Sequence, residues 1–359
     1  MTATVDIPAG IADLTPAWLT AALRADPSLS ADLTVSDVRA ERIAEDTGFS
    51  SLLYRLHLTG SEGAPRSLIA KLPGTPEARG AMELLGGYRK ELTFYSRVAG
   101  AAPMATPHCY VARIDDETSD FVLILEDLQD WHNADHLAGL PLEQAHTCID
   151  QLAALHAWSL TTADDEVLRQ FPPLDTPVAR DLLVPVFAPA WQIYREHTTQ
   201  PIPDRVADFA ERFAELAPQA LGALAERNML LHGDIRADNM FFRSTRLKVV
   251  DFQMVVRGAG AADIAYLVSQ GLPTDVRRGL DAPLLRRYLD ALAQHGVDDY
   301  SFEEAWRHYR FAVAYLMILP VVILIGWDSM PPRSRQLCVT LVDRAVATLT
   351  DIEALEVFA

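Results

Sequence analysis

The chain changes character near residue 127. Before this point the sequence reads mainly as strands, and after it mainly as amphipathic helices. Runs of strands followed by runs of helices are typical of α+β proteins. A chain of 359 residues also exceeds the usual size of one compact domain. We therefore expect a small β-rich lobe over residues 1–127 and a larger, mostly helical lobe over residues 128–359.

The predicted elements follow from local periodicity. Strands are expected within 34–58 on either side of a turn, and at 67–72, 121–125, 240–243 and 247–250. Helices are expected at 15–24, 87–98, 142–160, 204–226, 282–295 and 302–319. The two strands at 240–243 and 247–250 are close enough to form a hairpin.

The composition excludes several classes of protein. Half of the residues are hydrophobic and 22% are charged, which is enough apolar material for a packed core. A formal net charge of −18 argues against nonspecific binding to nucleic acid. Three distant cysteines suggest neither a disulfide framework nor a zinc site. A reducing cytoplasm is the expected location.

One apolar stretch, residues 311–327, raises the question of a membrane span. It is short, contains Pro320 and stands alone, so a buried helix of the larger lobe is the preferred interpretation. The N-terminus has no basic region followed by an apolar run, which argues against a secretory signal. We expect no membrane partner, and an integral membrane protein remains the less favoured alternative.

The segment with the clearest chemistry is His232-Gly233-Asp234, followed by Asn239 and then by Asp251-Phe252-Gln253. The hairpin between Asn239 and Asp251 would return both side chains to the same end. Their oxygens are the ligands that Mg²⁺ prefers, whereas Asp234 would lie beside the metal. The alternative is that these polar residues only cap turns and strands. That alternative does not explain why all three coincide.

This motif resembles that of the aminoglycoside phosphotransferase and choline kinase-like family, and most of all its ecdysteroid kinase-like branch. The resemblance implies a two-lobed protein-kinase-like fold. It also implies that Asp234 orients or deprotonates an acceptor hydroxyl while Asn239 and Asp251 hold Mg²⁺. His-Gly-Asp and Asp-Phe-Gln depart from the eukaryotic protein kinase motifs, so a protein substrate is disfavoured.

The resemblance extends upstream to Lys71, on the predicted strand 67–72, and to Glu91, on the predicted helix 87–98. Kinases pair a strand lysine with a helix glutamate to position the ATP phosphates. The chain has three lysines, which makes Lys71 more noticeable. The alternative is a solvent-facing lysine on an edge strand.

Weaker assignments complete the predicted nucleotide site. The loop over the phosphates would include Gly48, Phe49, Ser50 and Ser51, although an ordinary hairpin turn explains it equally well. The resemblance places a hinge for adenine at Glu126 to Leu128. The guanidinium of Arg236 would neutralise the transferred phosphoryl group, or would instead form an ion pair with Asp238 or Asp263.

Several nearby residues are expected to have structural roles. His232 would brace the loop by hydrogen bonds. Asp263 would cap the helix that follows it and brace the same loop. His132 and His136 share the spacing of a metal pair, but no third ligand is evident, so a solvated connection is favoured.

The predicted function is therefore an enzyme, a small-molecule kinase. It would use ATP or GTP with Mg²⁺ and transfer the γ-phosphoryl group to a hydroxyl of an aminoglycoside, a sugar, a sterol-like compound or another alcohol. The alternative is a catalytically silent nucleotide-binding module on a kinase-like scaffold, which would have no need of Asp234. The sequence predicts neither the acceptor nor the oligomeric state.

Overall fold

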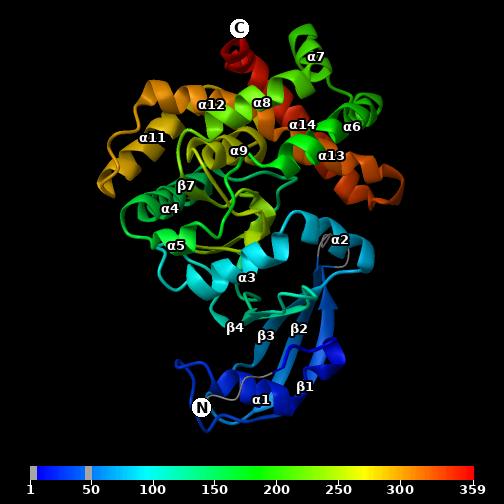
Figure 1. The fold of residues 1–359 in the computed structure, drawn as a ribbon, viewed down its shortest axis with the longest axis vertical. Coiled ribbons are helices and arrows are strands. Elements are labelled where there is room, and N and C mark those ends of the chain that lie inside the picture. The colour runs from blue at the N-terminus through cyan, green and yellow to red at the C-terminus, as the bar shows by residue number, and fades with distance from the viewer. Residues whose placement is uncertain (1–5, 45–50) are drawn as a thin grey trace. The chain divides into compact units, whose positions relative to one another are not determined.

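A computed structural model describes residues 6–44 and 51–359 of the chain. The chain divides into two compact units, traced in Figure 1. Unit 1 comprises Met1–Ala101 and Thr106–Asp130, and unit 2 comprises Ala102–Ala105 and Trp131–Ala359. Unit 1 is built around a sheet and unit 2 is mostly helical, so the predicted α+β architecture is confirmed.

Unit 1 contains an antiparallel five-stranded sheet in the order β1-β2-β3-β5-β4. Its strands are β1 (Val35–Ile43), β2 (Ser51–Gly60), β3 (Ser67–Pro73), β4 (Cys109–Ile114) and β5 (Phe121–Glu126). Its helices are α1 (Pro16–Arg24), α2 (Pro76–Leu84) and α3 (Gly87–Arg97). The predicted strands and the two predicted helices of this region are confirmed, and α2 and β4 had no predicted counterpart.

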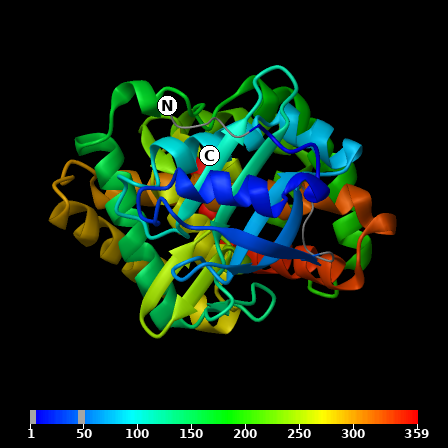
Figure 2. The ribbon, with the colours of Figure 1, turned by 90° about the horizontal axis from the view of Figure 1, so that it is seen from below.

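Both faces of this sheet are covered, which explains why β5 is apolar without alternation. Leu19 and Leu23 of α1 pack in one cluster with Ala70, Val122 and Ile124. Figure 2 shows α1 lying across this face of the sheet. Successive side chains of a strand point to opposite faces, so the neighbours of these residues face the other way, towards α3.

The second face carries the contacts between the sheet and α3. The rings of Phe121 on β5 and Tyr88 on α3 lie 4.6 Å apart, centroid to centroid. Lys71 pairs with Leu123 in the β3–β5 register and shares this face. The sheet therefore presents Lys71 to α3, and the core of unit 1 fixes its direction.

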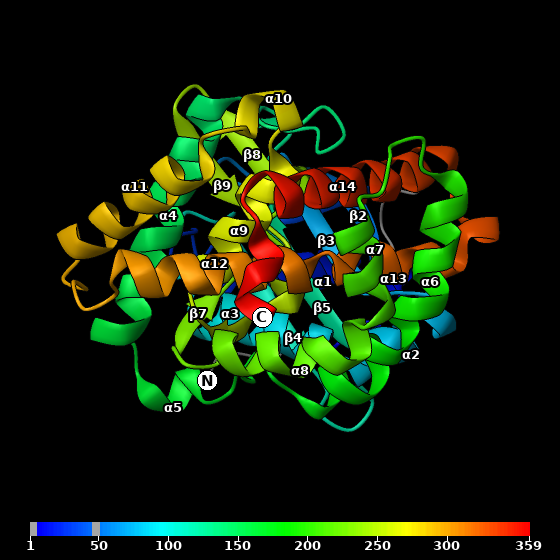
Figure 3. The same cartoon turned by 90° about the horizontal axis from the view of Figure 1, so that it is seen from above.

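Unit 2 is a helical body with two small sheets (Figures 1 and 3). Its helices are α4 (Leu142–Thr161), α5 (Asp165–Leu168), α6 (Val184–His197), α7 (Asp204–Glu211), α8 (Phe213–Leu224), α9 (Ala261–Gly271), α10 (Thr274–Arg277), α11 (Asp281–Gln294), α12 (Phe302–Leu316), α13 (Ile318–Ile323) and α14 (Pro332–Asp351). Every residue of α9 is buried. Figure 3 shows α9 among α4, α11, α12 and α14, all of which contact it.

Short strands of unit 2 flank the motif residues. The hairpin of β8 (Met240–Arg243) and β9 (Arg246–Val249) confirms the predicted pair of strands. β6 (His132–Asn133) adds to the other edge of β8. β7 (Met229–Leu231) pairs with β10 (Val256–Gly258).

Two predicted helices are interrupted. The helix predicted over 204–226 is divided between α7 and α8, because Arg212 leaves the helical region with φ −96° and ψ 9°. The helix predicted over 302–319 ends at Leu316, four residues before Pro320. A proline cannot donate to the carbonyl four residues earlier. The side-chain amide of Gln270 donates to the Leu316 carbonyl instead, at 3.2 Å.

The apolar stretch that raised the membrane question lies within this interrupted region. Among the described residues, Phe302–Ser329 is one stretch long and apolar enough to cross a membrane. Within its most apolar window, 61% of the residues are buried inside the structure. Tyr309 and Phe311 of α12 are fully or almost fully enclosed. This burial agrees with a helix in the core of unit 2.

Candidate active site

The loop after β7 takes a conformation that only glycine allows at Gly233. Its φ is +79°, and a Cβ atom there would lie 2.2 Å from the carbonyl oxygen of Met254. The chain therefore turns sharply between His232 and Asp234. This turn directs Asp234 away from the strand that precedes it.

The buried carboxylate of Asp263 holds the same turn. Asp263 accepts hydrogen bonds from the backbone amides of His232, at 2.7 Å, and Gly233, at 3.0 Å. Asp263 lies in the first turn of α9, where Gly260 is the N-cap. The predicted bracing of the loop by Asp263 agrees with these bonds, and its predicted role as a helix cap is wrong.

Asp263 is in turn supported by His156 on α4. The His156 Nε2 atom lies 3.2 Å from Asp263 Oδ2, and its Nδ1 atom lies 2.8 Å from the Tyr288 hydroxyl. Burial raises the pKa of Asp263, but the hydrogen bond and charge of His156 outweigh it, so the pKa lies below the ordinary value. Gly260 leaves the space for this network, since a Cβ there would lie 1.9 Å from the Tyr288 hydroxyl oxygen.

Asp234 and Asn239 are joined directly. The Asn239 side-chain amide donates to the Asp234 carbonyl oxygen, at 2.9 Å, and to its carboxylate Oδ2, at 3.3 Å. His232 braces the same loop as predicted, because its Nδ1 accepts from the Asp234 amide and its Nε2 lies 3.1 Å from the Val250 carbonyl oxygen. The three residues therefore form one hydrogen-bonded loop.

Asp251 follows the hairpin at a strained position. The Val250 amide donates to the Asn239 carbonyl oxygen at 3.0 Å, so the chain returns beside Asn239 just before Asp251. Asp251 has φ +67° and ψ 68°, a left-handed conformation that costs energy for a residue other than glycine. The backbone therefore brings Asn239 and Asp251 to the same end of the hairpin, as predicted.

The donor set at this end fits a divalent cation that prefers oxygen. Asn239 provides an amide oxygen and Asp251 a carboxylate, and Mg²⁺ typically takes one or two such protein ligands together with phosphate oxygens and water. The nitrogen of the Asn239 amide points to Asp234, which leaves its oxygen on the other side of the group. No group of three or more His, Cys, Asp or Glu with metal-site geometry occurs among the described residues.

Arg236 and Tyr266 both approach Asp234. The Arg236 Nε atom lies 3.4 Å from Asp234 Oδ2, and the Tyr266 hydroxyl donates to Asp234 Oδ1 at 3.4 Å. The charge of Asp234 raises the pKa of Arg236 above its usual value, and Asp251 adds to the effect. The partner of Arg236 is therefore Asp234, and not Asp238 or Asp263 as the ion-pair interpretation expected.

Sequence reasoning did not identify Tyr266. It lies three residues after Asp263 on α9, and residues with this spacing share a helix face. Once Asp263 was expected to support the loop, this spacing was the signal that could have found Tyr266. Burial and the nearby Asp234 charge raise the pKa of Tyr266, so its hydroxyl stays protonated as a donor.

In unit 1 the structure brings Lys71 and Glu91 together. The Lys71 Nζ atom lies 2.8 Å from Glu91 Oε1 and 2.8 Å from Oε2. The Lys71 side chain is 8% exposed and that of Glu91 1% exposed. The alternative of a solvent-facing lysine on an edge strand is wrong, since β3 lies between β2 and β5.

The other predicted nucleotide contacts are less well defined. Gly48, Phe49 and Ser50 lie outside the described residues. Ser51 begins β2, and its hydroxyl bonds with that of Tyr88. Glu126 ends β5, and its backbone amide already donates to the His108 carbonyl oxygen at 2.8 Å. That amide is not available to a ligand, so a hinge contact by Glu126 would use its carbonyl.

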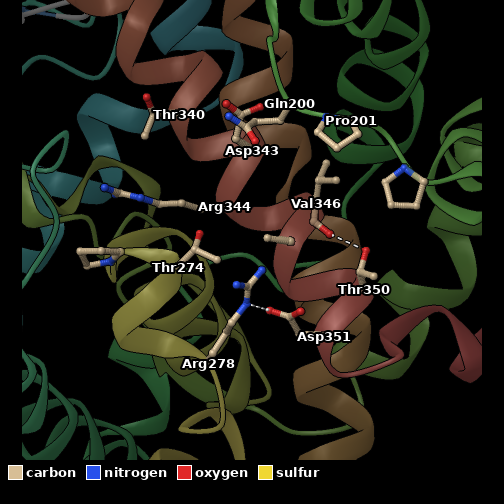
Figure 4. Close-up of a pocket in the computed structure, with 13 residues that line it drawn as sticks. Gln200, Pro201, Thr274, Arg278, Thr340, Asp343, Arg344, Val346, Thr350 and Asp351 are labelled. Carbon is tan, nitrogen blue, oxygen red and sulfur yellow. Dashed lines mark hydrogen bonds and ion pairs between the residues drawn. The ribbon is translucent and has the colours of Figure 1, made fainter.

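A separate cavity of about 500 Å³ lies in unit 2 against α10 and α14 (Figure 4). Asp343 faces it, and its Oδ1 atom accepts from the hydroxyls of Tyr194 and Thr198, both at 2.7 Å. Arg344 also lines it, and Figure 4 shows its guanidinium extending away from Asp343. None of the predicted site residues lines this cavity.

Solved structures identify the fold as that of the protein-kinase-like phosphotransferases. The chain is similar to choline kinase from Cryptosporidium parvum Iowa II (12% identity over 89% of this chain and 91% of that chain, TM-score 0.58). It is also similar to Plasmodium vivax ethanolamine kinase (13%, 95% and 90%, TM-score 0.54). A third similar structure is the GDP complex of aminoglycoside 2'-phosphotransferase-IIIa (14%, 89% and 95%, TM-score 0.54).

The family follows from the sequence model that matches this chain. Residues 46–298, more than two thirds of the chain, match the ecdysteroid kinase-like family, and the chain belongs to that family. No curated protein matches the sequence at a significant level. The resemblance inferred from the motifs is thus confirmed, and the chain has the fold and the family of small-molecule kinases.

Proposed function

We propose that this protein transfers the γ-phosphoryl group of a nucleoside triphosphate, ATP or GTP, to a hydroxyl group of a small molecule. The observation that carries the proposal is the single hydrogen-bonded loop that contains Asp234 and Asn239 and returns at Asp251. Phosphoryl transfer needs a carboxylate beside the acceptor hydroxyl and oxygen ligands for a metal. This loop supplies both within one small segment of unit 2.

Asp234 is the proposed catalytic carboxylate. It is partly exposed, so an acceptor hydroxyl can reach it, and three neighbours restrict its orientation: Asn239, Arg236 and Tyr266. In this role it orients the hydroxyl and receives its proton. A module that only binds nucleotide would have no need of so constrained a carboxylate at this place.

Asn239 and Asp251 are the proposed metal ligands. Bound Mg²⁺ would neutralise charge on the phosphates of the nucleotide. The left-handed backbone of Asp251 supports this role, because strained positions of this kind cluster at functional sites. Arg236, beside Asp234, is proposed to neutralise charge that develops on the transferred group.

Unit 1 is the proposed nucleotide-binding part, with Lys71 positioned by Glu91 to contact phosphates. Ser51 and the backbone of Glu126 and Leu128 would add contacts. The nucleotide-binding role of the lobe predicted over residues 1–127 remains a proposal, as do the catalytic and acceptor-binding role of residues 128–359 and a cytoplasmic location. The names of the similar structures suggest amino alcohols and aminoglycosides as the first acceptors to screen.

The test is transfer of the γ-phosphoryl group from labelled ATP or GTP to a panel of hydroxylated small molecules. Wild type should label at least one acceptor, and Asp234→Asn should lose about a hundredfold or more of the rate while still binding nucleotide. Asp290→Asn, at an exposed position of α11, is the matched control and should retain full activity. Equal rates in Asp234→Asn and wild type would refute the catalytic role.

A further inference from the structure

His136, outside the motif, contacts the loop between Asp234 and Asn239 twice. Its ring Nδ1 accepts a hydrogen bond from the Ala237 amide at 2.9 Å. Its own backbone amide donates to Asp238 Oδ1 at 3.0 Å. Two successive residues of the turn that leads to Asn239 are therefore held by one residue more than 100 positions earlier in the chain.

The His136 ring is held in the tautomer whose Nδ1 atom accepts a hydrogen bond. Because Nδ1 accepts a hydrogen bond from the Ala237 amide, the proton of a neutral imidazole must be on Nε2. Burial lowers the pKa of His136 well below its usual value, and the charges of Arg236 and Arg344 lower it further. The ring thus remains a neutral acceptor. His132, Asn133 and Asp135 are exposed, in agreement with the predicted solvated connection, whereas His136 is buried and departs from it.

His136 is also a costly choice if its role were packing alone. Its Nε2 atom is buried and has no hydrogen-bond partner among the described residues. Burying a polar group without a partner is unfavourable, and an apolar side chain would avoid that cost. A residue that departs from local optimisation in this way marks a position with another purpose.

The segment around His136 is itself fixed from α14. Arg344, 7% exposed, donates to the carbonyl oxygens of His136 at 2.9 Å, Leu137 at 2.8 Å and Gln270 at 3.0 Å. On the other side, the side-chain amide of Asn133 donates to the carbonyl oxygens of Asp238 and Met240. His136 is thus held on both sides while it contacts Ala237.

We infer that His136 is a positioning residue that holds the Ala237–Asn239 turn, and through it the metal ligand Asn239, in its working geometry. This inference rests on the proposed function of the same loop. His136 touches neither the acceptor nor the metal in this account. It acts through the Ala237 amide, with Arg344 fixing the backbone of His136 itself.

The experiment compares His136→Leu with His136→Asn. Asparagine keeps an acceptor oxygen near the position of Nδ1, and leucine removes it at similar size. The readout is the Mg²⁺ concentration that gives half of the ATP-induced rise in melting temperature. His136→Leu should raise it about five- to tenfold, as expected for one lost hydrogen bond, and His136→Asn should stay within about twofold of wild type.

Hydrogen exchange of the peptide that covers residues 232–243 provides a second readout that needs no nucleotide. Protection should fall in His136→Leu and return in His136→Asn. An unchanged Mg²⁺ requirement in a folded His136→Leu would overturn the inference, whatever the exchange result. If His136→Leu does not fold, His136→Gln, which displaces the acceptor by one methylene, should show the same rise in the Mg²⁺ requirement. A wild-type Mg²⁺ requirement in His136→Gln would also overturn the inference.

The same experiment separates this inference from the proposed function. A wild-type protein that shows no Mg²⁺-dependent response to ATP or GTP refutes the proposed function, and His136 is then a structural contact only. A wild-type response that survives unchanged in His136→Leu refutes the inference and leaves the proposed function standing.

Discussion

At the scale of single residues, Gly233 shows how closely the backbone around Asp234 is constrained. Any other residue would have to adopt a φ of +79° and place its Cβ within 2.2 Å of the Met254 carbonyl oxygen. The first requirement costs about 1 kcal/mol, whereas the second requires the backbone itself to move. The glycine of the His-Gly-Asp motif is thus explained by geometry.

Gly233→Ala should therefore lose about 3 kcal/mol or more of the free energy of unfolding, because conformational strain and a backbone clash add. Gly296→Ala is the matched control, since Gly296 has φ +88° but, among the described residues beyond its chain neighbours, no atom within 4 Å of its Cβ position. It should lose only about 1 kcal/mol. Urea unfolding of both variants measures the difference, and equal losses would mean that the Met254 contact is unimportant.

The Lys71–Glu91 pair belongs to the same scale. Both side chains are almost fully buried, so removal of one leaves the other charged, enclosed and without its main partner. Such a loss costs about 3–5 kcal/mol, whereas replacing both partners by apolar residues is often close to neutral. The pair therefore adds little net stability to unit 1, and its evident effect is to fix the position of Lys71.

Lys71→Met should destabilise the protein by about 3 kcal/mol or more, and Lys71→Met/Glu91→Leu should recover most of this loss. Nucleotide binding should be weakened in both. Arg212→Met breaks an exposed pair with Glu215 and should leave unfolding unchanged. A double variant that regains nucleotide binding together with stability would show that Lys71 has no role beyond the pair.

The sequence predicted the residues that carry the proposed chemistry, and among the residues that hold them it predicted His232 and Asp263 but not Tyr266, His136 or Arg344. Asp234, Asn239, Asp251, Lys71 and Glu91 have strong motif spacing. The structure pairs Lys71 with Glu91, joins Asn239 to Asp234 and returns the chain beside Asn239 just before Asp251, and the roles of these residues remain proposals. Tyr266, His136 and Arg344 act through hydrogen bonds between distant parts of the chain. Apart from the helical spacing that relates Tyr266 to Asp263, local periodicity cannot reveal such contacts, because it contains no information on which helices meet.

At the scale of elements, α3 carries an unexpected buried cation beside Glu91. Lys90 is 7% exposed, and burial lowers its pKa from 10.5 to about 8. Between about pH 8 and pH 10.5, Lys90 of the unfolded chain still holds the proton that Lys90 of the folded chain has released. Unfolding then takes up a proton, so this group makes stability rise with pH over that window.

Lys90→Met should accordingly raise the free energy of unfolding near pH 7 by up to about 3 kcal/mol, the full cost of holding the charge in a buried site. The gain should shrink above about pH 8 and vanish near pH 10.5, where both states are neutral. Arg97→Met, at an exposed position of the same helix, should show no such dependence. Denaturation over this pH range provides the measurement.

The predicted elements succeeded where packing is local in sequence and failed where it is not. The run Phe121–Leu125 of β5 was identifiable because both faces of the sheet are covered, so these five residues are all apolar. The break after Leu316 follows from Pro320, yet the partner of the freed carbonyl is Gln270, far away in sequence. The helix α14 had no predicted counterpart.

At the scale of the whole molecule, two units supply two sets of groups. Unit 1 provides the Lys71–Glu91 pair, and unit 2 provides the loop of Asp234, Asn239 and Asp251. The fold and family are those of kinase-like phosphotransferases. The acceptor is not encoded in these shared features, because function resides in sites that vary on a common fold.

The central claim is that this chain binds a nucleoside triphosphate through Mg²⁺ held by Asp251. The most direct measurement is a thermal-shift titration with ATP and with GTP, each with and without Mg²⁺, in wild type and Asp251→Ala. A ligand at a hundred times its dissociation constant stabilises by about 2.7 kcal/mol. We expect a Mg²⁺-dependent rise in melting temperature in wild type that is lost in Asp251→Ala; no rise with either nucleotide, or an equal rise in the variant, would contradict the account.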